Sequence, residues 1–124
     1  MNLEFKRKLP TLQEIKAMYP IDDTLAEFKK ETDRTLKNIF EGKDDRLLLV
    51  IGPCSADRED AVLDYIGRLR TVQEKVRDKI VIVPRIYTNK PRTTGDGYKG
   101  MLHQPDPHES ENMLKGLIAL RKLH

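Results

Sequence analysis

The sequence predicts an α/β protein in which two parallel strands are joined by a helix. Two runs of consecutive apolar residues, Leu47–Ile51 and 80–83, lack polar alternation, which is typical of parallel strands covered on both faces. An amphipathic stretch separates them, so strand, helix and strand follow one another within about forty residues, as in a βαβ unit. The loops that follow the two strands are therefore expected to open at the same edge of the sheet.

Residues 1–43 are expected to form an amino-terminal helical arm, and arms of this kind often dock on another surface. A short helix is predicted at 11–18, and apolar residues at three- and four-residue spacing predict a longer one at 23–41. Side chains that accept hydrogen bonds from free amides favour helix starts. The expected capping residues are Thr11 for the first helix and Asp22 or Asp23 for the second.

Residues 44–124 are expected to form a strand, helix, strand, helix segment. A long polar stretch at 88–109 is rich in glycine and proline, and loops of this length in compact domains usually serve a site. The remaining predicted elements are a helix at 58–77 capped by Asp57, the second strand interrupted by Pro84, and a last helix at 110–123.

Composition excludes several functional classes. The chain has 124 residues and a net charge of +3, from 23 Lys and Arg against 20 Asp and Glu, so no broad basic face predicts a nucleic-acid partner. No apolar run approaches the roughly 18 residues of a membrane span, and the start lacks the apolar stretch of a signal peptide. With one cysteine and no internal disulfide, the expected location is the cytoplasm.

Cys54 follows the first strand after the step Gly52-Pro53, which is expected to form a tight turn and direct the next side chain outward. A thiolate at this place suits a divalent transition metal. The alternative is that Cys54 is a small buried hydrophobic residue.

A cluster of cations follows the second strand. Arg85, Lys90 and Arg92 lie within eight residues, with Pro91 stiffening the backbone and Thr93 adding a hydroxyl. Arginine offers a planar fork for phosphate or carboxylate and lysine a compact point charge, so the cluster suits a small substrate with several negative charges. The alternative is a solvated charged loop.

Four segments together resemble one enzyme family. The segments are the run from Asp44 to Ser55 ending in Ile-Gly-Pro-Cys-Ser, then Arg85-Ile86-Tyr87, then Lys90-Pro91-Arg92-Thr93-Thr94, and Tyr98-Lys99-Gly100. In order and spacing they are similar to the class I 3-deoxy-7-phosphoheptulonate (DAHP) synthases, over the amino-terminal third of the family's length.

The resemblance implies the amino-terminal portion of a (β/α)8 TIM barrel preceded by a helical arm, with the barrel incomplete, because such a barrel takes about 250 residues. It implies condensation of phosphoenolpyruvate with erythrose 4-phosphate at a divalent metal of the Mn, Fe, Co or Zn class. By resemblance, Cys54 is the metal ligand and Lys90 is catalytic. Also by resemblance, the substrate-binding residues are Arg85, Lys90, Pro91, Arg92 and Thr93.

The resemblance also implies what this segment lacks. The family's other metal ligands and further phosphoenolpyruvate contacts lie on later strands, so we expect the chain alone to be inactive and to hold metal weakly. Expected partners are an aromatic amino acid effector, further copies of the chain, or a chain supplying the remaining strands. The alternatives to an enzyme are a non-catalytic module that pairs with a full-length synthase, and a remnant without present function.

Overall fold

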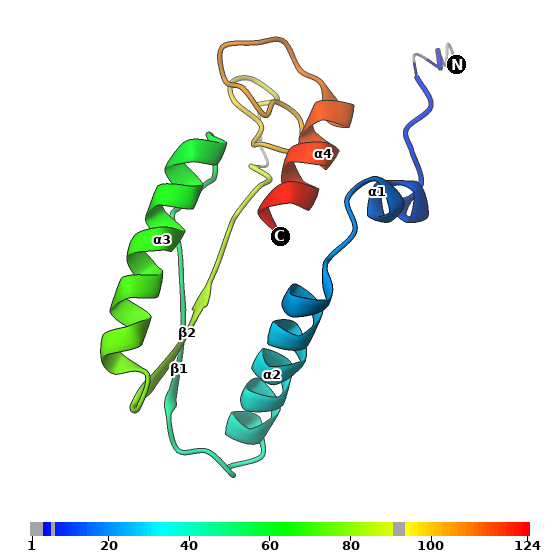
Figure 1. The fold of residues 1–124 in the computed structure, drawn as a ribbon. Coiled ribbons are helices and arrows are strands. Elements are labelled where there is room, and N and C mark those ends of the chain that lie inside the picture. Colours follow the sequence, from blue (N-terminus) through cyan, green and yellow to red (C-terminus); the bar gives the residue numbers. More distant parts are fainter. Residues whose placement is uncertain (1–3, 6, 91–93) are drawn as a thin grey trace.

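The computed structural model describes residues 4–5, 7–90 and 94–124 and consists of two parallel strands and four helices. The sheet lies between α3 and α2, with α3 in contact with β2 and α2 in contact with β1 (Figure 1). The elements in chain order are α1 Leu12–Met18, α2 Asp23–Phe40, β1 Leu47–Ile51, α3 Glu59–Val76, β2 Ile80–Pro84 and α4 Met113–Leu123.

The two arm helices begin where their capping side chains predict. The Thr11 hydroxyl accepts from the Glu14 N–H, and the Glu14 carboxylate accepts from the Thr11 N–H at 2.6 Å, which completes a capping box. The carboxylate of Asp22 accepts from the Leu25 N–H at 2.7 Å, so Asp22 is the cap of α2. Gly42 follows that helix with φ of +68°, the left-handed conformation that favours glycine.

The strands pair in parallel, as predicted, with register running from Leu47 opposite Ile80 to Ile51 opposite Pro84. Pro84 belongs to β2 and does not interrupt it, contrary to the prediction. In this register the backbone groups of Pro84 face the outer edge of β2, where its missing N–H costs no bond to β1.

Two further predictions are wrong in detail. The first residue of α3 is Glu59 and its N-cap is Arg58, which makes no side-chain capping bond, so Asp57 lies too early to cap this helix. The last helix begins at Met113, because Asn112 accepts from the Lys115 N–H at 3.1 Å and fixes the start there.

In this segment β1 is not covered on both faces. Leu47 is 62% exposed and Val50 is 57% exposed. Within the described part of the chain the sheet has two strands, so little packs against its apolar residues. Among these same residues, none of the helices combines the length and apolar character of a membrane span.

The buried core lies at the carboxyl end of the strands. Ala56, Val62 and Met101 form it, and α4 closes over it (Figure 1). α4 approaches closely at Gly116, where a Cβ atom would lie 1.9 Å from the carbonyl oxygen of Leu102. The core therefore supports the loops that follow the strands more than it supports the sheet.

Candidate functional site

The candidate site consists of the loops that follow the two strands. The loop at 52–58 follows β1 and carries Cys54, and the loop at 85–90 follows β2 and carries Arg85 and Lys90. We call them the β1 loop and the β2 loop. Parallel pairing brings the two strand ends to one edge of the sheet, which is where α/β proteins build ligand sites.

Backbone hydrogen bonds hold the two loops side by side. The N–H of Arg85 donates to the Ile51 carbonyl at 2.9 Å, and the N–H of Ala56 donates to the Tyr87 carbonyl at 2.8 Å. Between these two bonds, a Cβ atom on Gly52 would lie 1.7 Å from the Arg85 carbonyl oxygen. Glycine is therefore required here by close approach between the loops, and Gly52 does not have the positive φ of a left-handed turn.

Residues 99–102, in the long polar stretch, form hydrogen bonds that support the β2 loop. The N–H of Lys90 donates to the Lys99 carbonyl at 2.8 Å, and the N–H of Leu102 donates to the Thr88 carbonyl at 3.1 Å. Gly100 lies between them with φ of +100°, and a Cβ atom there would lie 2.6 Å from the Thr88 oxygen. These contacts show that part of the stretch 88–109 packs back against the β2 loop.

Tyr98 links the same stretch to the β1 loop, a contact that sequence reasoning did not identify. Its hydroxyl lies 3.3 Å from the Ala56 carbonyl oxygen and 3.4 Å from that of Asp57. Burial first, and the nearby Asp57 carboxylate second, raise the pKa of the Tyr98 phenol, so the hydroxyl keeps the proton that it donates. The sequence feature that could have indicated this contact is an aromatic residue directly after a glycine-rich turn.

The chemistry-bearing side chains remain accessible. Cys54 and Arg85 are exposed and Lys90 is half-buried, so the alternative of Cys54 as a buried hydrophobic residue is wrong. The Arg85 guanidinium lies 4.7 Å from the centre of the Tyr87 ring, which orients it by a cation–π contact. Pro91, Arg92 and Thr93 lie outside the described residues.

Cys54, the expected metal ligand, does not belong to a metal-binding cluster in the part of the chain that is described. No group of three His, Cys, Asp or Glu side chains there could hold a metal ion. Since metal sites in proteins usually use three or four protein ligands, the described residues do not form a complete metal centre at Cys54.

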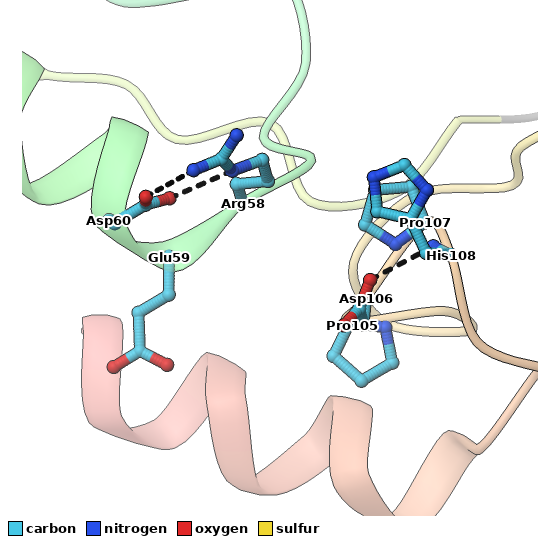
Figure 2. Close-up of a pocket in the computed structure, with 7 residues that line it drawn as sticks. All are labelled: Arg58, Glu59, Asp60, Pro105, Asp106, Pro107 and His108. Atoms are coloured by element: carbon cyan, nitrogen blue, oxygen red, sulfur yellow. Dashed lines mark hydrogen bonds and ion pairs between the residues drawn. The ribbon is translucent and has the colours of Figure 1, made fainter.

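A separate hollow lies beside the start of α3 and is not this site. It has a cavity volume of about 430 Å³ and lies between the first turn of α3 and residues 105–108 (Figure 2). The Arg58 guanidinium pairs with Asp60, which lowers the pKa of that carboxyl and raises the pKa of Arg58. Because Arg58 is neutralised and Glu59 and Asp106 are acidic, the hollow does not suit a phosphate.

Comparison with known proteins identifies the family. The sequence model of the DAHP synthetase I family matches residues 19–120. A phospho-2-dehydro-3-deoxyheptonate aldolase of Haemophilus influenzae is 42% identical over 105 residues, which are 85% of this chain and 29% of that protein. The Phe-sensitive enzyme of that name from Escherichia coli is 37% identical over 120 residues, 97% of this chain and 34% of that protein.

A solved structure extends the likeness to the fold. A phospho-2-dehydro-3-deoxyheptonate aldolase from Francisella tularensis superposes with a TM-score of 0.88 at 33% identity, covering 98% of this chain and 36% of that one. The chain therefore spans about a third of the length of these three relatives. On the family match, which covers most of its length, the chain belongs to the DAHP synthetase I family.

Proposed function

We propose that this chain supplies the first strands and two of the ligand-binding loops of a (β/α)8 barrel that condenses phosphoenolpyruvate with erythrose 4-phosphate. The observation that carries the proposal is the fixed contact between the β1 and β2 loops, which brings a thiol and two cations to one edge of the sheet in a member of this family. The products would be 3-deoxy-D-arabino-heptulosonate 7-phosphate and phosphate, at the start of the shikimate pathway.

In this proposal the cations hold the negative charge of both substrates. Arg85 and Lys90 contact phosphoenolpyruvate, with Lys90 next to the reacting atoms, and Lys90, Pro91, Arg92 and Thr93 bind erythrose 4-phosphate. Exposure of Arg85 and partial burial of Lys90 fit these roles, since both side chains can reach a ligand above the loops. Preorganised cations stabilise charge better than mobile ones because they do not reorganise during the reaction.

Cys54 is proposed as one ligand of a divalent metal, which when bound would polarise a substrate carbonyl as a Lewis acid. The exposed thiol fits this role. Because the described residues contain no group of three His, Cys, Asp or Glu side chains that could hold a metal ion, we propose that metal is held firmly only when further strands are present.

The effector is also proposed from the relatives. The names of two Escherichia coli relatives describe a Phe-sensitive and a Trp-sensitive enzyme. We propose an aromatic amino acid effector for this chain, with residues 1–43 as the arm that contributes to its binding or to contacts between copies.

The alternative function is a non-catalytic module that pairs with a full-length synthase or with a chain supplying the remaining strands. Exposed apolar residues on the sheet and on the flanking helix favour association. Phe40 is 79% exposed, Phe28 is 71% exposed and Leu47 is 62% exposed. Surfaces of this kind are normally covered in stable proteins.

The test is a thermal melt of the purified chain, followed by circular dichroism, with phosphoenolpyruvate added. Ligand at 100 times its dissociation constant adds about 2.7 kcal/mol to the folded state. We expect the melting temperature to rise for the wild type and for Lys79→Met, which removes an exposed cation at the other end of β2. We expect no rise for Lys90→Met, and an equal rise in all three proteins would contradict the assigned anion site.

A second experiment separates the enzyme from the module. The chain is mixed with a Haemophilus influenzae relative that lacks the matching 105-residue segment, and phosphate release is measured with both substrates. Release that depends on both substrates and on Lys90 supports the enzyme. Stable association without release supports the module.

A further inference from the structure

Tyr98 stands at the point where the chain returns to the β2 loop. The chain leaves that loop at Lys90 and comes back at Lys99, whose carbonyl accepts from the Lys90 N–H at 2.8 Å. The bond from the Leu102 N–H to the Thr88 carbonyl, at 3.1 Å, continues this pairing in the antiparallel sense. The returning segment is therefore fixed against the β2 loop, and Tyr98 directly precedes it.

The side chain of Tyr98 reaches the other loop. Its hydroxyl lies 3.3 Å from the Ala56 carbonyl oxygen and 3.4 Å from that of Asp57, both in the β1 loop. A phenol has one proton to donate, so the two oxygens share it. The N–H of Ala56 donates to the Tyr87 carbonyl of the β2 loop at 2.8 Å. Ala56 is thus held at its N–H by the β2 loop and at its carbonyl by Tyr98.

The returning segment is itself anchored near the start of α4. The Lys99 ammonium pairs with the Glu111 carboxylate at 3.0 Å. The helix packs closely on the same segment, since a Cβ atom on Gly116 would lie 1.9 Å from the Leu102 carbonyl oxygen. Because its support is fixed in this way, the Tyr98 hydroxyl holds the β1 loop in place and does not simply follow it.

We infer that Tyr98 is a positioning residue, which sets the spacing between the β1 loop with Cys54 and the β2 loop with Lys90. It acts through the backbone: on one side it bonds to Ala56, two residues after Cys54, and on the other it adjoins the residue that bonds to Lys90. The inference rests on the proposed function, which assigns both loops to ligand binding. Loops that are ordered before binding lose less freedom when a ligand binds.

This contact joins the loops of two neighbouring strands. Further strands would add at the outer edges of the two-stranded sheet that the described residues form. They would therefore not displace Tyr98, and its role is the same in this segment and in a longer barrel.

The first test is the backbone mobility of the full chain, measured as ¹⁵N order parameters by NMR. Tyr98→Phe keeps the ring and removes the hydroxyl. The order parameters of Lys90 and Ala56 should fall from about 0.85 toward about 0.6, while Val83 in β2 stays near about 0.85. Tyr65→Phe makes the same chemical change on α3 and should leave all three values unchanged.

A merely stabilising role of the hydroxyl would shift the folding equilibrium without changing mobility within the folded state. The measurement is therefore made at a temperature at which circular dichroism shows every variant to be folded. Equal order parameters at Lys90 and Ala56 in Tyr98→Phe and the wild type would overturn the inference. No substrate enters this experiment, so its outcome is independent of the proposed function.

The second test is the affinity for phosphoenolpyruvate, measured by isothermal titration calorimetry on the same folded proteins. Tyr98→Phe should bind about two- to tenfold more weakly than the wild type, the worth of one hydrogen bond, and Tyr65→Phe should bind like the wild type. Equal affinity of the three proteins would overturn the inference that this spacing serves the ligand. No binding by the wild type would contradict the proposed function, and the order parameters would still decide whether Tyr98 fixes the loops.

Two measurements on the wild type decide the case in which Tyr98→Phe does not fold. Nuclear Overhauser contacts should join the Tyr98 ring to Ala56 or Asp57, because the hydroxyl lies within hydrogen-bond distance of both carbonyls. Lys90 should have the order parameter of a rigid backbone, about 0.85. Both results together support the inference, and the lack of either one would overturn it.

Discussion

Gly52→Ala is expected to separate the β1 and β2 loops and destabilise the chain. The added methyl carbon would lie 1.7 Å from the Arg85 carbonyl oxygen, 2.7 Å from its carbonyl carbon and 3.1 Å from its Cα. All three atoms belong to the backbone, so no side-chain rotation relieves the clash. The strand ends must move apart to accommodate the methyl group.

The free-energy cost of this movement comes from overpacking and from the hydrogen bonds that it weakens. Overpacking in a well-packed region costs roughly 1–3 kcal/mol. The hydrogen bonds on either side, from Arg85 to Ile51 and from Ala56 to Tyr87, contribute about 0.5–1.5 kcal/mol each. With partial relaxation, we expect a loss of about 2–4 kcal/mol, a large part of the 5–15 kcal/mol that stabilises typical domains.

The assay is equilibrium urea unfolding followed by far-ultraviolet circular dichroism. Gly67→Ala is the matched control, because Gly67 lies in α3 and a Cβ atom there has nothing within 4 Å. It should stabilise the chain by about 0.5–1 kcal/mol, since alanine favours helix. If Gly52→Ala unfolds at the same urea concentration as the wild type, the close approach of the two loops is not essential.

Three further results are expected. A hydrogen bond from Arg46 lowers the pKa of Asp44, so the pair contributes stability above the ordinary aspartate pKa of about 4 and loses it as the pH falls further. In Arg46→Gln, a carboxyl titration followed by NMR should show that the pKa of Asp44 returns to its ordinary range. Tyr98→Phe should lower stability by about 0.5–1.5 kcal/mol in urea unfolding, because it removes the hydroxyl contact with the β1 loop. Arg121→Ala removes the 2.9 Å bond from its Nε to the Tyr19 carbonyl, and faster hydrogen exchange in α1 with unchanged exchange in β2 should follow.

Local sequence patterns were sufficient for most of the regular structure. Apolar runs predicted β1 with its observed bounds, and three- and four-residue spacing predicted α2 and α3 to within one residue at each end. Thr11 and Asp22 were identifiable as caps because a capping side chain bonds to amides only two or three residues away. These features depend on neighbours in sequence, so a sequence is enough to find them.

Features that depend on distant residues were not predictable in this way. The start of α3 could not be assigned by composition, because acidic residues stand at both 57 and 59–60 and any of them resembles a cap. Pro84 was read as an interruption, since only the register shows that its nitrogen faces away from β1. The hydrogen bonds from the Gln73 side chain to the backbone of β2 depend on how α3 packs against the sheet, which local patterns do not specify.

The candidate site was partly predictable for a related reason. A βαβ unit dictates that the loops after its two strands meet, so the sequence alone places the Cys54 and Arg85 loops together. It does not dictate that Tyr98 and Lys99 return to the same loops, because the path of the stretch 88–109 is set by contacts such as the one between Gly100 and Thr88. The contacts that support the site could therefore be identified only in the structure.

The position of the core suggests how the chain relates to a larger barrel. Among the described residues, the core of Ala56, Val62 and Met101 lies at the loop end of the strands, whereas Leu47 and Val50 of β1 remain largely exposed. Burying more of β1 would favour folding by about 25 cal/mol for each Å² of apolar surface removed from water. Further strands would therefore gain stability mainly by covering the sheet, while the loops that carry Arg85 and Lys90 already have their supporting contacts.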